Sequence, residues 1–537
     1  MSRSPVSLLL PSFAFVLVAL SLGQFGHAQQ SAQPSATAHT PVPTLSVTSR
    51  LVLVDTVVRD KNGNPVTDLK REDFAVYEDK VPQRIDSFEP PSLHTLPAGS
   101  NAISFNLDEP KSFGQSPVTI LVLDELNTHF EDSSFAVRSV KQYLDARPAL
   151  LAQPTTLMLV SDNKFRVLQN FTRDRDILLK ALRDQSVHYA WKLEGDKSIG
   201  YGALERLDQS LSALEQIAQS TARIQGRKNL VWIGQGFPSI DPSELATKDE
   251  DLISDTIEHV TNVLLDTRVT LYPVDPTSSA AGMVEITDPT QLEFAQAAGD
   301  SFVRNADPFG AQLDFDRLGP VTGGRVIRGM NDIDKQIASS VDLGTKFYTI
   351  GYSPSSSNDA PRQYRNIRIV CLRAGLTVTT RNGYYTTPPA SQSSKATLIY
   401  DLNAAALSSI PLNALKVTVE PKSAPALTGS YIVHVDASTL TWHSTNEGTS
   451  STRVAVLIVG LSSKDKILSH TLQSMSATTK NGADLQTSGK TADFLITSSL
   501  PKGVERLRFV VREMETGRIG TADVALSTRK LSQIDHE

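Results

Sequence analysis

The chain has 537 residues and a single cysteine, Cys371, so it cannot form an intramolecular disulfide. Small secreted domains often need disulfides, but a chain of this length can bury a core large enough to do without them. Cys371 lies within the apolar segment IRIVCL. This pattern predicts a buried strand residue and not a nucleophile, because a reactive thiol needs exposure and an electropositive setting.

Basic clusters are also missing from the sequence. The chain has 52 Lys and Arg against 58 Asp and Glu, a formal net charge of −6, and no Lys/Arg run with interleaved aromatic residues. Nucleic-acid-binding domains usually show a basic excess or a basic patch, so we expect no nucleic-acid partner. The 40% hydrophobic and 20% charged content is ordinary for globular domains. The length predicts about two to four of them.

A long apolar run occurs only near the N-terminus. Arg3 precedes the apolar residues from Leu8 to Leu22. Gly26-His27-Ala28 then places small residues at the −3 and −1 positions of a cleavage site. This pattern predicts a secretory signal peptide, residues 1–28, with cleavage before Gln29. The alternative is an uncleaved membrane anchor, although Pro11 interrupts the short run. We expect an exported protein without a transmembrane segment after cleavage, either periplasmic, associated with the outer surface or secreted.

Composition divides the segment that follows. Residues 29–44 are rich in Ser, Thr, Ala, Pro and Gln, which predicts a disordered linker. Residues 45–88 alternate apolar and polar side chains around a turn signal at Asp60 to Pro65, which predicts a small β module. Residues 89–116, rich in Pro, Ser, Gly and Asn, form a connector.

Strand and helix patterns then alternate from residue 117 to residue 353. The uncharged run TILVL leads into Asp124 and predicts a buried parallel strand. A helical pattern follows from Glu131 and stops at Pro148. The alternation predicts a doubly wound, Rossmann-type α/β sheet with right-handed crossovers. Such sheets bind ligands at the carboxyl edge of their strands, where Asp124 falls.

The end of this region and the C-terminal region are predicted from strand patterns. GGRVIRG (residues 323–329) and KFYTIGYSP (residues 346–354) are expected to finish the alternation, after an insertion at 277–312. The pattern of residues 354–388 predicts a β segment. This segment is expected to complete the unit that the α/β region forms with the β module. Residues 396–527 carry short strand patterns at the spacing of an all-β, immunoglobulin-like sandwich. Residues 528–537 form a polar tail.

The segments TILVLD, GRKNLVWIGQGFP, YPVDP and TGGRVIRG resemble the von Willebrand factor type A (VWA) fold. The order of segments from LVLVDTVVRDKNGNPVTDLKREDFAVYED to RNIRIVCLRAGLTVTTRNGYY resembles the VWFA-related acidobacterial domain family of exported proteins. The likeness covers about Leu45 to Tyr385 and lies in segment order more than in one motif. It implies a VWA-like domain and no enzyme activity.

The resemblance also implies where a metal could bind. VWA domains that bind a metal use a DxSxS turn after the first strand, and the turn here runs from Asp124 to Thr128. The aspartate and the final hydroxyl are present, but Leu126 replaces the middle serine and cannot be a ligand. We therefore expect Asp124, Asn127 and Thr128 to contribute to any such site.

Two further loops of the chain, which the resemblance matches to ligand loops of VWA domains, lack the expected metal ligands. Gly234-Gln235-Gly236 stands where such domains place an aspartate, and Gly200-Tyr201-Gly202 stands where they place a threonine. Mg²⁺ prefers several oxygen ligands and sheds its water reluctantly. The expectation is a degenerate adhesion-type metal site that binds Mg²⁺ weakly or not at all. The alternative role for Asp124 is to cap the turn or the helix that follows.

Three strand-ending carboxylates at one edge, Asp124, Asp162 and Asp275, raise the alternative of a metal-assisted hydrolase. Aspartates at strand ends are also common turn formers, and the sequence favours that role. The chain contains no GxSxG elbow, no HExxH motif and no phosphate-binding P-loop. We therefore expect a protein that is not an enzyme.

The function expected from the sequence is non-catalytic binding of a protein or a cell-surface polymer at the carboxyl edge of the sheet. The side chains expected to contact the partner are polar or aromatic: Glu125, His129, Tyr201, Gln235 and Phe237. The alternative is a cell-envelope scaffold or assembly protein with a vestigial edge. In a further alternative, Phe237 packs beneath the insertion at 277–312.

Export with cleavage gives the first testable prediction. Mass spectrometry of the protein isolated from its own cells should find a chain that starts at or near Gln29, because Gly26-His27-Ala28 fits a signal-peptidase site. Recovery of an intact chain that starts at Met1 from the membrane fraction would contradict it.

Overall fold

The computed structural model describes residues 51–162, 165–188, 193, 201–237, 247–277, 315–355, 363–386, 395–422, 428–444, 449–480 and 489–526. The expected signal peptide, the linker at 29–44, nearly all of the insertion at 277–312 and the tail lie outside these residues. Residues Ser49–Glu537 form one compact unit. In the described part of the chain, no helix has the length and apolar character needed to span a membrane.

The central sheet is organised around β5 (Val118–Asp124), whose residues are all buried. Its strand order is β7-β6-β5-β8-β9. β6 (Leu150–Val160), β8 (Lys228–Ile233) and β9 (Val269–Val274) run parallel to their inner neighbours, while β7 (Phe165–Asp174) is antiparallel to β6. The chain thus winds outward from β5 in both directions. The prediction of a mixed α/β fold with a parallel-strand sheet is confirmed.

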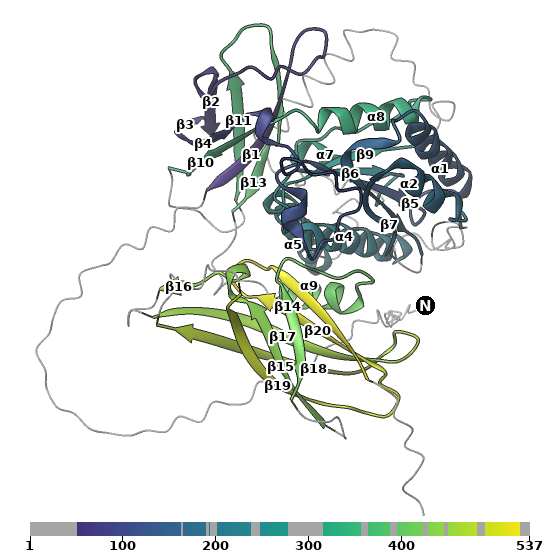
Figure 1. Ribbon diagram of the computed structural model, residues 1–537, viewed down its shortest axis with the longest axis vertical. Helices are drawn as coiled ribbons and strands as arrows, with labels where there is room; N and C mark the ends of the chain where they lie inside the picture. Colours follow the sequence, from purple (N-terminus) through teal and green to yellow (C-terminus); the bar gives the residue numbers. More distant parts are fainter. Residues whose placement is uncertain are drawn as a thin grey trace, which may run out of the picture. The chain divides into compact units, whose positions relative to one another are not determined.

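Helices cover both faces of this sheet (Figure 1). One face packs against α1 (Phe130–Asp145), α2 (Arg175–Arg183) and α8 (Ile333–Leu343). The other face packs against α4 (Tyr201–Thr221), α5 (Thr247–Asp266) and α7 (Phe315–Val321). In α1 the buried residues Ala136, Val140, Tyr143 and Leu144 follow the helical spacing that the sequence predicted.

The β module consists of two four-stranded sheets around one apolar core. The first sheet orders β12 (Thr377–Thr380), β1 (Val52–Arg59), β10 (Tyr348–Tyr352) and β4 (Ile85–Glu89). The second orders β13 (Gly383–Tyr385), β11 (Tyr364–Cys371), β2 (Phe74–Glu78) and β3 (Val81–Gln83). Short 3₁₀ helices occur at Arg71–Asp73, Pro91–Leu93 and Pro110–Phe113.

Two predictions about the end of the alternation are wrong. KFYTIGYSP does not join the central sheet, because β10 pairs with β1 and β4 of the β module. A fully buried strand has the same apolar pattern whichever sheet surrounds it, so its sequence could not show its partners. GGRVIRG forms a single bridge, between Ile327 and Val274, and no strand. Cys371 ends strand β11 and is half-buried, so it is more exposed than predicted.

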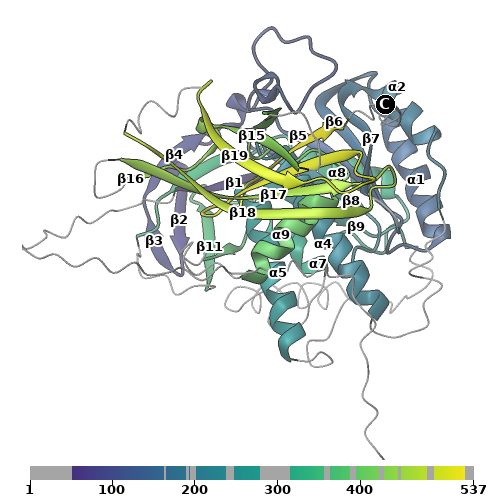
Figure 2. The same cartoon turned by 90° about the horizontal axis from the view of Figure 1, so that it is seen from below.

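The C-terminal region contains two antiparallel sheets that share a core, and Figure 2 looks onto their strands. One sheet orders β14 (Val417–Pro421), β15 (Thr428–Asp436) and β19 (Thr491–Ser499). The other orders β16 (His443–Ser444), β17 (Ser450–Leu461), β20 (Arg506–Glu513) and β21 (Ile519–Ala525), with β18 (Ile467–Thr479) also paired to β17. A 3₁₀ helix spans Ala437–Thr439.

The sequence pattern predicted that this region is all β, and that prediction is wrong. Helix α9 (Lys395–Leu407) precedes the first strand and packs against α4, α5 and β20. Its segment ATLIYDLNAAAL does not alternate and is rich in Ala and Leu, which are strong helix formers. Those residues carried a helix signal that the surrounding strand patterns obscured.

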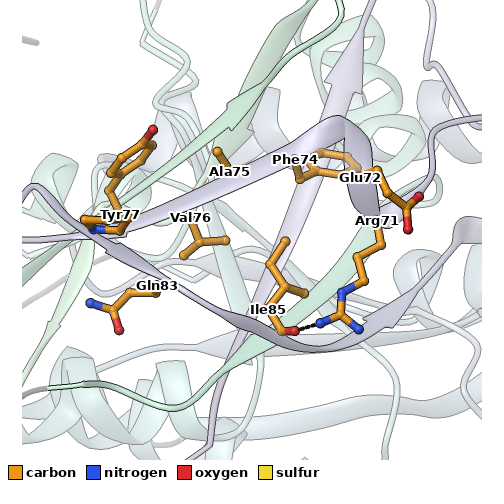
Figure 3. A pocket seen from close by; sticks show the side chains of 9 residues that line it. Arg71, Glu72, Phe74, Ala75, Val76, Tyr77, Gln83 and Ile85 are labelled. Atoms are coloured by element: carbon orange, nitrogen blue, oxygen red, sulfur yellow. Dashed lines mark hydrogen bonds between the residues drawn. The ribbon is translucent and has the colours of Figure 1, made fainter.

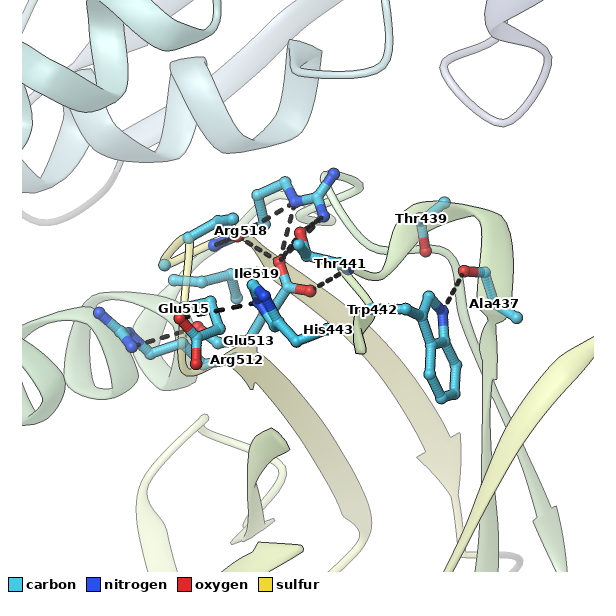
Figure 4. A network of polar contacts seen from close by, with 12 residues as sticks. Ala437, Thr439, Thr441, Trp442, His443, Arg512, Glu513, Glu515, Arg518 and Ile519 are labelled. Atoms are coloured by element: carbon cyan, nitrogen blue, oxygen red, sulfur yellow. Dashed lines mark hydrogen bonds and ion pairs between the residues drawn. The ribbon is translucent and has the colours of Figure 1, made fainter. Parts of the chain in front are cut away.

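A polar network closes the end of the β20–β21 hairpin (Figure 4). The side chain of Glu513 is fully buried, and Arg518 donates to its Oε2 from Nε at 3.1 Å and from Nη2 at 2.9 Å. The backbone N–H of Thr441 and the hydroxyl of Thr516 donate to the same carboxylate. Because every contact is charge-assisted, this network should be stronger than ordinary surface pairs.

Glu513 and Glu515 provide a matched comparison of stability. Glu513→Ala should lower the free energy of unfolding by about 3 kcal/mol, because it removes the buried partner of several donors. Glu515 is partly exposed and pairs with the exposed Arg453 at 3.2 Å, so Glu515→Ala should cost less than about 1 kcal/mol. Urea denaturation of both variants measures the difference, and equal losses would contradict this account.

Candidate functional site

Asp124 ends β5 at the carboxyl edge of the central sheet, and its side chain is buried. Oδ1 accepts the backbone N–H groups of Leu126 at 3.0 Å and Asn127 at 2.9 Å. Oδ2 accepts Nε1–H of Trp232 at 2.9 Å and the amide of Asn127 at 3.3 Å. The carboxylate therefore closes the turn that follows β5, in the manner of an Asx turn.

Trp232 reaches Asp124 because β8 lies beside β5 in the sheet. The indole is fully buried, and its ring lies 5.5 Å from the ring of Phe315 between centroids. Burial raises the pKa of Asp124 above its ordinary value, and the hydrogen bonds from Asn127 and Trp232 partly oppose that rise. The indole N–H thus takes up a lone pair of Oδ2 that a metal ion would otherwise use.

The loop after β8 presses closely against the same turn. A Cβ placed on Gly234 would lie 2.5 Å from Cβ of Asp124 and 2.6 Å from Oγ1 of Thr128, so only glycine fits. The next backbone N–H, that of Gln235, donates to Oγ1 of Thr128 at 3.2 Å. Protein atoms thus fill the space between the two loops.

The structure brings the predicted metal ligands Asp124, Asn127 and Thr128 together but does not leave them free to bind a cation. The Asp124 oxygens and the Thr128 hydroxyl already accept protein donors. The Asn127 amide nitrogen also donates to Oγ of Ser210 at 3.0 Å, and its buried Oδ1 accepts no hydrogen bond. One amide oxygen does not satisfy Mg²⁺, so the residues do not fit this ion.

Two of the predicted partner-binding side chains, Glu125 and Phe237, are buried, and we correct those predictions. The Glu125 carboxylate is 2% exposed and accepts Nδ1 of His188 at 3.2 Å. Burial raises the pKa of Glu125, and His188 partly opposes the rise. The ring of Phe237 packs edge-on against Phe315 at 5.0 Å, because an apolar ring gains more by entering the core.

The remaining predicted contacts differ in their settings. His129 is exposed beside the start of α1. Gln235 is half-buried, and its amide donates to Oγ1 of Thr277 at 2.9 Å. The side chain of Tyr201 lies outside the described part of the chain, although its backbone begins α4. Asp275 accepts both the N–H and the hydroxyl of Thr277, which is the role of a turn former.

Sequence reasoning missed Phe130, the first residue of α1, which is 43% exposed at the carboxyl edge. Glu131 and Asp132 follow it, and partial burial together with Asp275 raises the pKa of Asp132. A signal was available, because Phe130 lies off the apolar stripe that contains Ala136. An aromatic residue outside the buried stripe of a helix indicates an exposed ring.

A second exposed apolar side chain belongs to the same edge. Met330 is 45% exposed and lies in the segment between Ile327 and the start of α8. Arg328 in this segment forms an ion pair with Asp316 at 2.6 Å. The edge therefore presents apolar and charged groups together.

A groove of about 320 Å³ lies in the β module (Figure 3). Phe74, Val76 and Ile85 form its apolar lining, and Arg71 donates to the backbone carbonyl of Ile85. The adjoining strands β3 and β4 each end their sheet. The groove thus combines apolar surface with the unpaired edges of two strands.

Because protein donors occupy both oxygens of Asp124, we expect Mg²⁺ to have little effect on the stability of the protein. Adding 5 mM Mg²⁺ should change the melting temperature by less than about 1 °C, because a ligand stabilises only in proportion to RT ln(1 + [L]/Kd). Differential scanning fluorimetry with and without chelator measures the change. A reversible rise of several degrees that Asp124→Asn abolishes would contradict the closed site.

No family model and no curated protein matches this chain. Among solved structures, it is similar to proximal thread matrix protein 1 from the mussel byssus, at 12% identity over 43% of this chain, with a TM-score of 0.23. The chain spans about half the length of that protein, 48%. It is also similar to the SpRpn10 VWA domain, at 15% identity over 30% of this chain and 88% of that one, with a TM-score of 0.16. With TM-scores this low, neither likeness carries a functional argument.

Proposed function

We propose that this chain is an exported, non-catalytic binding protein that contacts a protein or a cell-surface polymer through the carboxyl edge of its central sheet. In this proposal the central domain is VWA-like, as in the VWFA-related acidobacterial family, and the C-terminal sheets form an immunoglobulin-like sandwich. The strand order supports the location, since the chain winds outward from β5 in both directions and open α/β sheets of this kind bind ligands at the carboxyl edge.

The observation that carries the proposal is the exposed ring of Phe130 at this edge. Carboxylates of Glu131 and Asp132 adjoin it, and Met330 is a second exposed apolar side chain at the edge. Aromatic anchors surrounded by polar groups are typical of protein recognition surfaces. Since Asp124 is engaged by protein donors, a partner would contact the outer side chains and not a metal ion.

The same geometry disfavours hydrolysis. A general base must be within hydrogen-bond reach of the proton that it removes, and Asp124 and Glu125 are buried, with Asp124 accepting Trp232 and Glu125 accepting His188. Asp275 accepts from Thr277. Asp124 and Asp275 therefore hold the turns in which they lie.

The scaffold alternative is favoured by a different observation, the groove in the β module. Its apolar lining and the free edges of β3 and β4 suit an extended peptide, which could add a strand to either sheet. In this alternative the β module and the C-terminal sheets carry the contacts, and the carboxyl edge carries none.

Phe130→Ala separates the two proposals. Crosslinking of the full mature chain on the cells that make it should capture a partner, and Phe130→Ala should reduce that capture about tenfold or more. Leu150→Ala is the matched control, because Leu150 is 51% exposed but starts β6 at the opposite edge of the sheet. Both variants should melt within about 2 °C of the parent, since both side chains are exposed.

Undiminished capture by Phe130→Ala would contradict binding at the carboxyl edge. Loss of capture only in Gln83→Arg, which places a longer, charged side chain beside Val76 in the groove of the β module, would favour the scaffold alternative. Gln83 is half-buried on the edge strand β3 directly opposite Val76, so its side chain lies on the same face as the groove lining.

A further inference from the structure

Three polar side chains from three helices meet in the interior, away from the carboxyl edge. Glu215 comes from α4, His259 from α5 and Asp401 from α9, and one ligand atom from each lies within 4.8 Å of the others. The carboxylates of Glu215 and Asp401 are 2% and 0% exposed, and the His259 side chain is 17% exposed. Each of these helices packs against another of the three.

Glu215 is the unusual member of this cluster. Both of its carboxylate oxygens are buried, and neither accepts a hydrogen bond. Nε2 of His259 lies 2.7 Å from Oδ1 of Asp401 but 3.9 Å from Oε1 of Glu215, so its single hydrogen cannot serve both carboxylates. A buried carboxylate without a donor is costly, and buried charges are normally paired or coordinate a metal.

The three ligand atoms have the chemistry of a cation site. One imidazole nitrogen with two carboxylates suits a divalent transition metal such as Zn²⁺ better than Mg²⁺, which prefers oxygen alone. Ligand atoms about 2.1 Å from a tetrahedral ion are roughly 3.4 Å apart. The observed separations of 2.7 Å and 3.9 Å bracket that value, so small side-chain movements suffice.

The surroundings also resemble those of a metal ligand set. Nε of Arg512 on β20 donates to Oδ2 of Asp401 at 2.5 Å, which fixes that carboxylate and leaves Oδ1 facing His259. Metal-ligating carboxylates are typically oriented in this way by a second partner. Gly517 lies beside the imidazole: a Cβ added to this glycine would lie 3.8 Å from Cε1 of His259. The β20–β21 hairpin thus covers the cluster.

We infer that Glu215, His259 and Asp401 bind one divalent transition-metal cation, which links α4 and α5 to α9. The cation supplies a directly bonded partner for the Glu215 carboxylate, whose oxygens accept no hydrogen bond. Binding requires the neutral imidazole and both carboxylates, so any proton held by the cluster leaves to solvent. The bound cation stabilises the junction between the central domain and the C-terminal region.

Zn²⁺ titration of the full chain tests this inference. After gel filtration, elemental analysis should find one equivalent of Zn²⁺, and saturating Zn²⁺ should raise the melting temperature by about 4 °C or more, with reversal by chelator. Glu215→Gln keeps the shape of the side chain but removes its charge. This variant should bind Zn²⁺ at least tenfold more weakly, and in chelator it should melt no lower than the parent.

His434 provides the control, because it also lies beside two carboxylates, Asp493 at 2.7 Å and Glu420 at 3.6 Å, but those side chains are 53% and 72% exposed. His434→Ala should leave Zn²⁺ binding unchanged. The inference is overturned if the parent chain retains no Zn²⁺, if Glu215→Gln binds it as tightly as the parent, or if His434→Ala abolishes binding.

Discussion

The structure of the carboxyl edge depends on the hydrogen bonds that the buried carboxylate of Asp124 accepts. Leaving it without donors at the end of β5 would cost several kcal/mol, and the surrounding segments are arranged to prevent that. The next turn supplies its backbone N–H groups, and β8 supplies the Trp232 indole. Gly234 lets the second loop approach closely. Because protein donors surround the carboxylate, the side chains exposed at this edge lie outside the turn, and they include Phe130, which the proposed partner would contact.

The same rule leads to the opposite conclusion at the interior cluster. There Glu215 is buried and accepts no hydrogen bond, whereas both oxygens of Asp124 accept protein donors. Burial and the neighbouring Asp401 raise the pKa of Glu215 to about 7, and His259 partly opposes the rise. Hydrogen-bond donors are thus plentiful around the carboxylate at the carboxyl edge and missing around Glu215 at the junction of α4, α5 and α9.

Sequence patterns predicted the parts of the fold that are locally determined. The buried run of β5 and the stripe of α1 follow from apolar spacing alone. The pairing of β10 within the β module could not be predicted, because a buried strand does not indicate its neighbours. For the site, the sequence placed Asp124 correctly but not the direction of Phe237, which depends on packing against the distant Phe315. Glu215, His259 and Asp401 lie far apart in the chain and match no motif, so only the fold brings them together.

The state of Asp124 can be observed directly through the indole N–H of Trp232. In a ¹⁵N-tryptophan-labelled sample, Trp232→Phe would assign that resonance among the three tryptophans of the chain. A proton that is buried and bonded to Oδ2 at 2.9 Å should exchange slowly with solvent and keep its chemical shift when 10 mM Mg²⁺ or chelator is added. Rapid exchange, or a shift that moves with Mg²⁺, would show that the carboxylate is open to a cation and would contradict the closed edge.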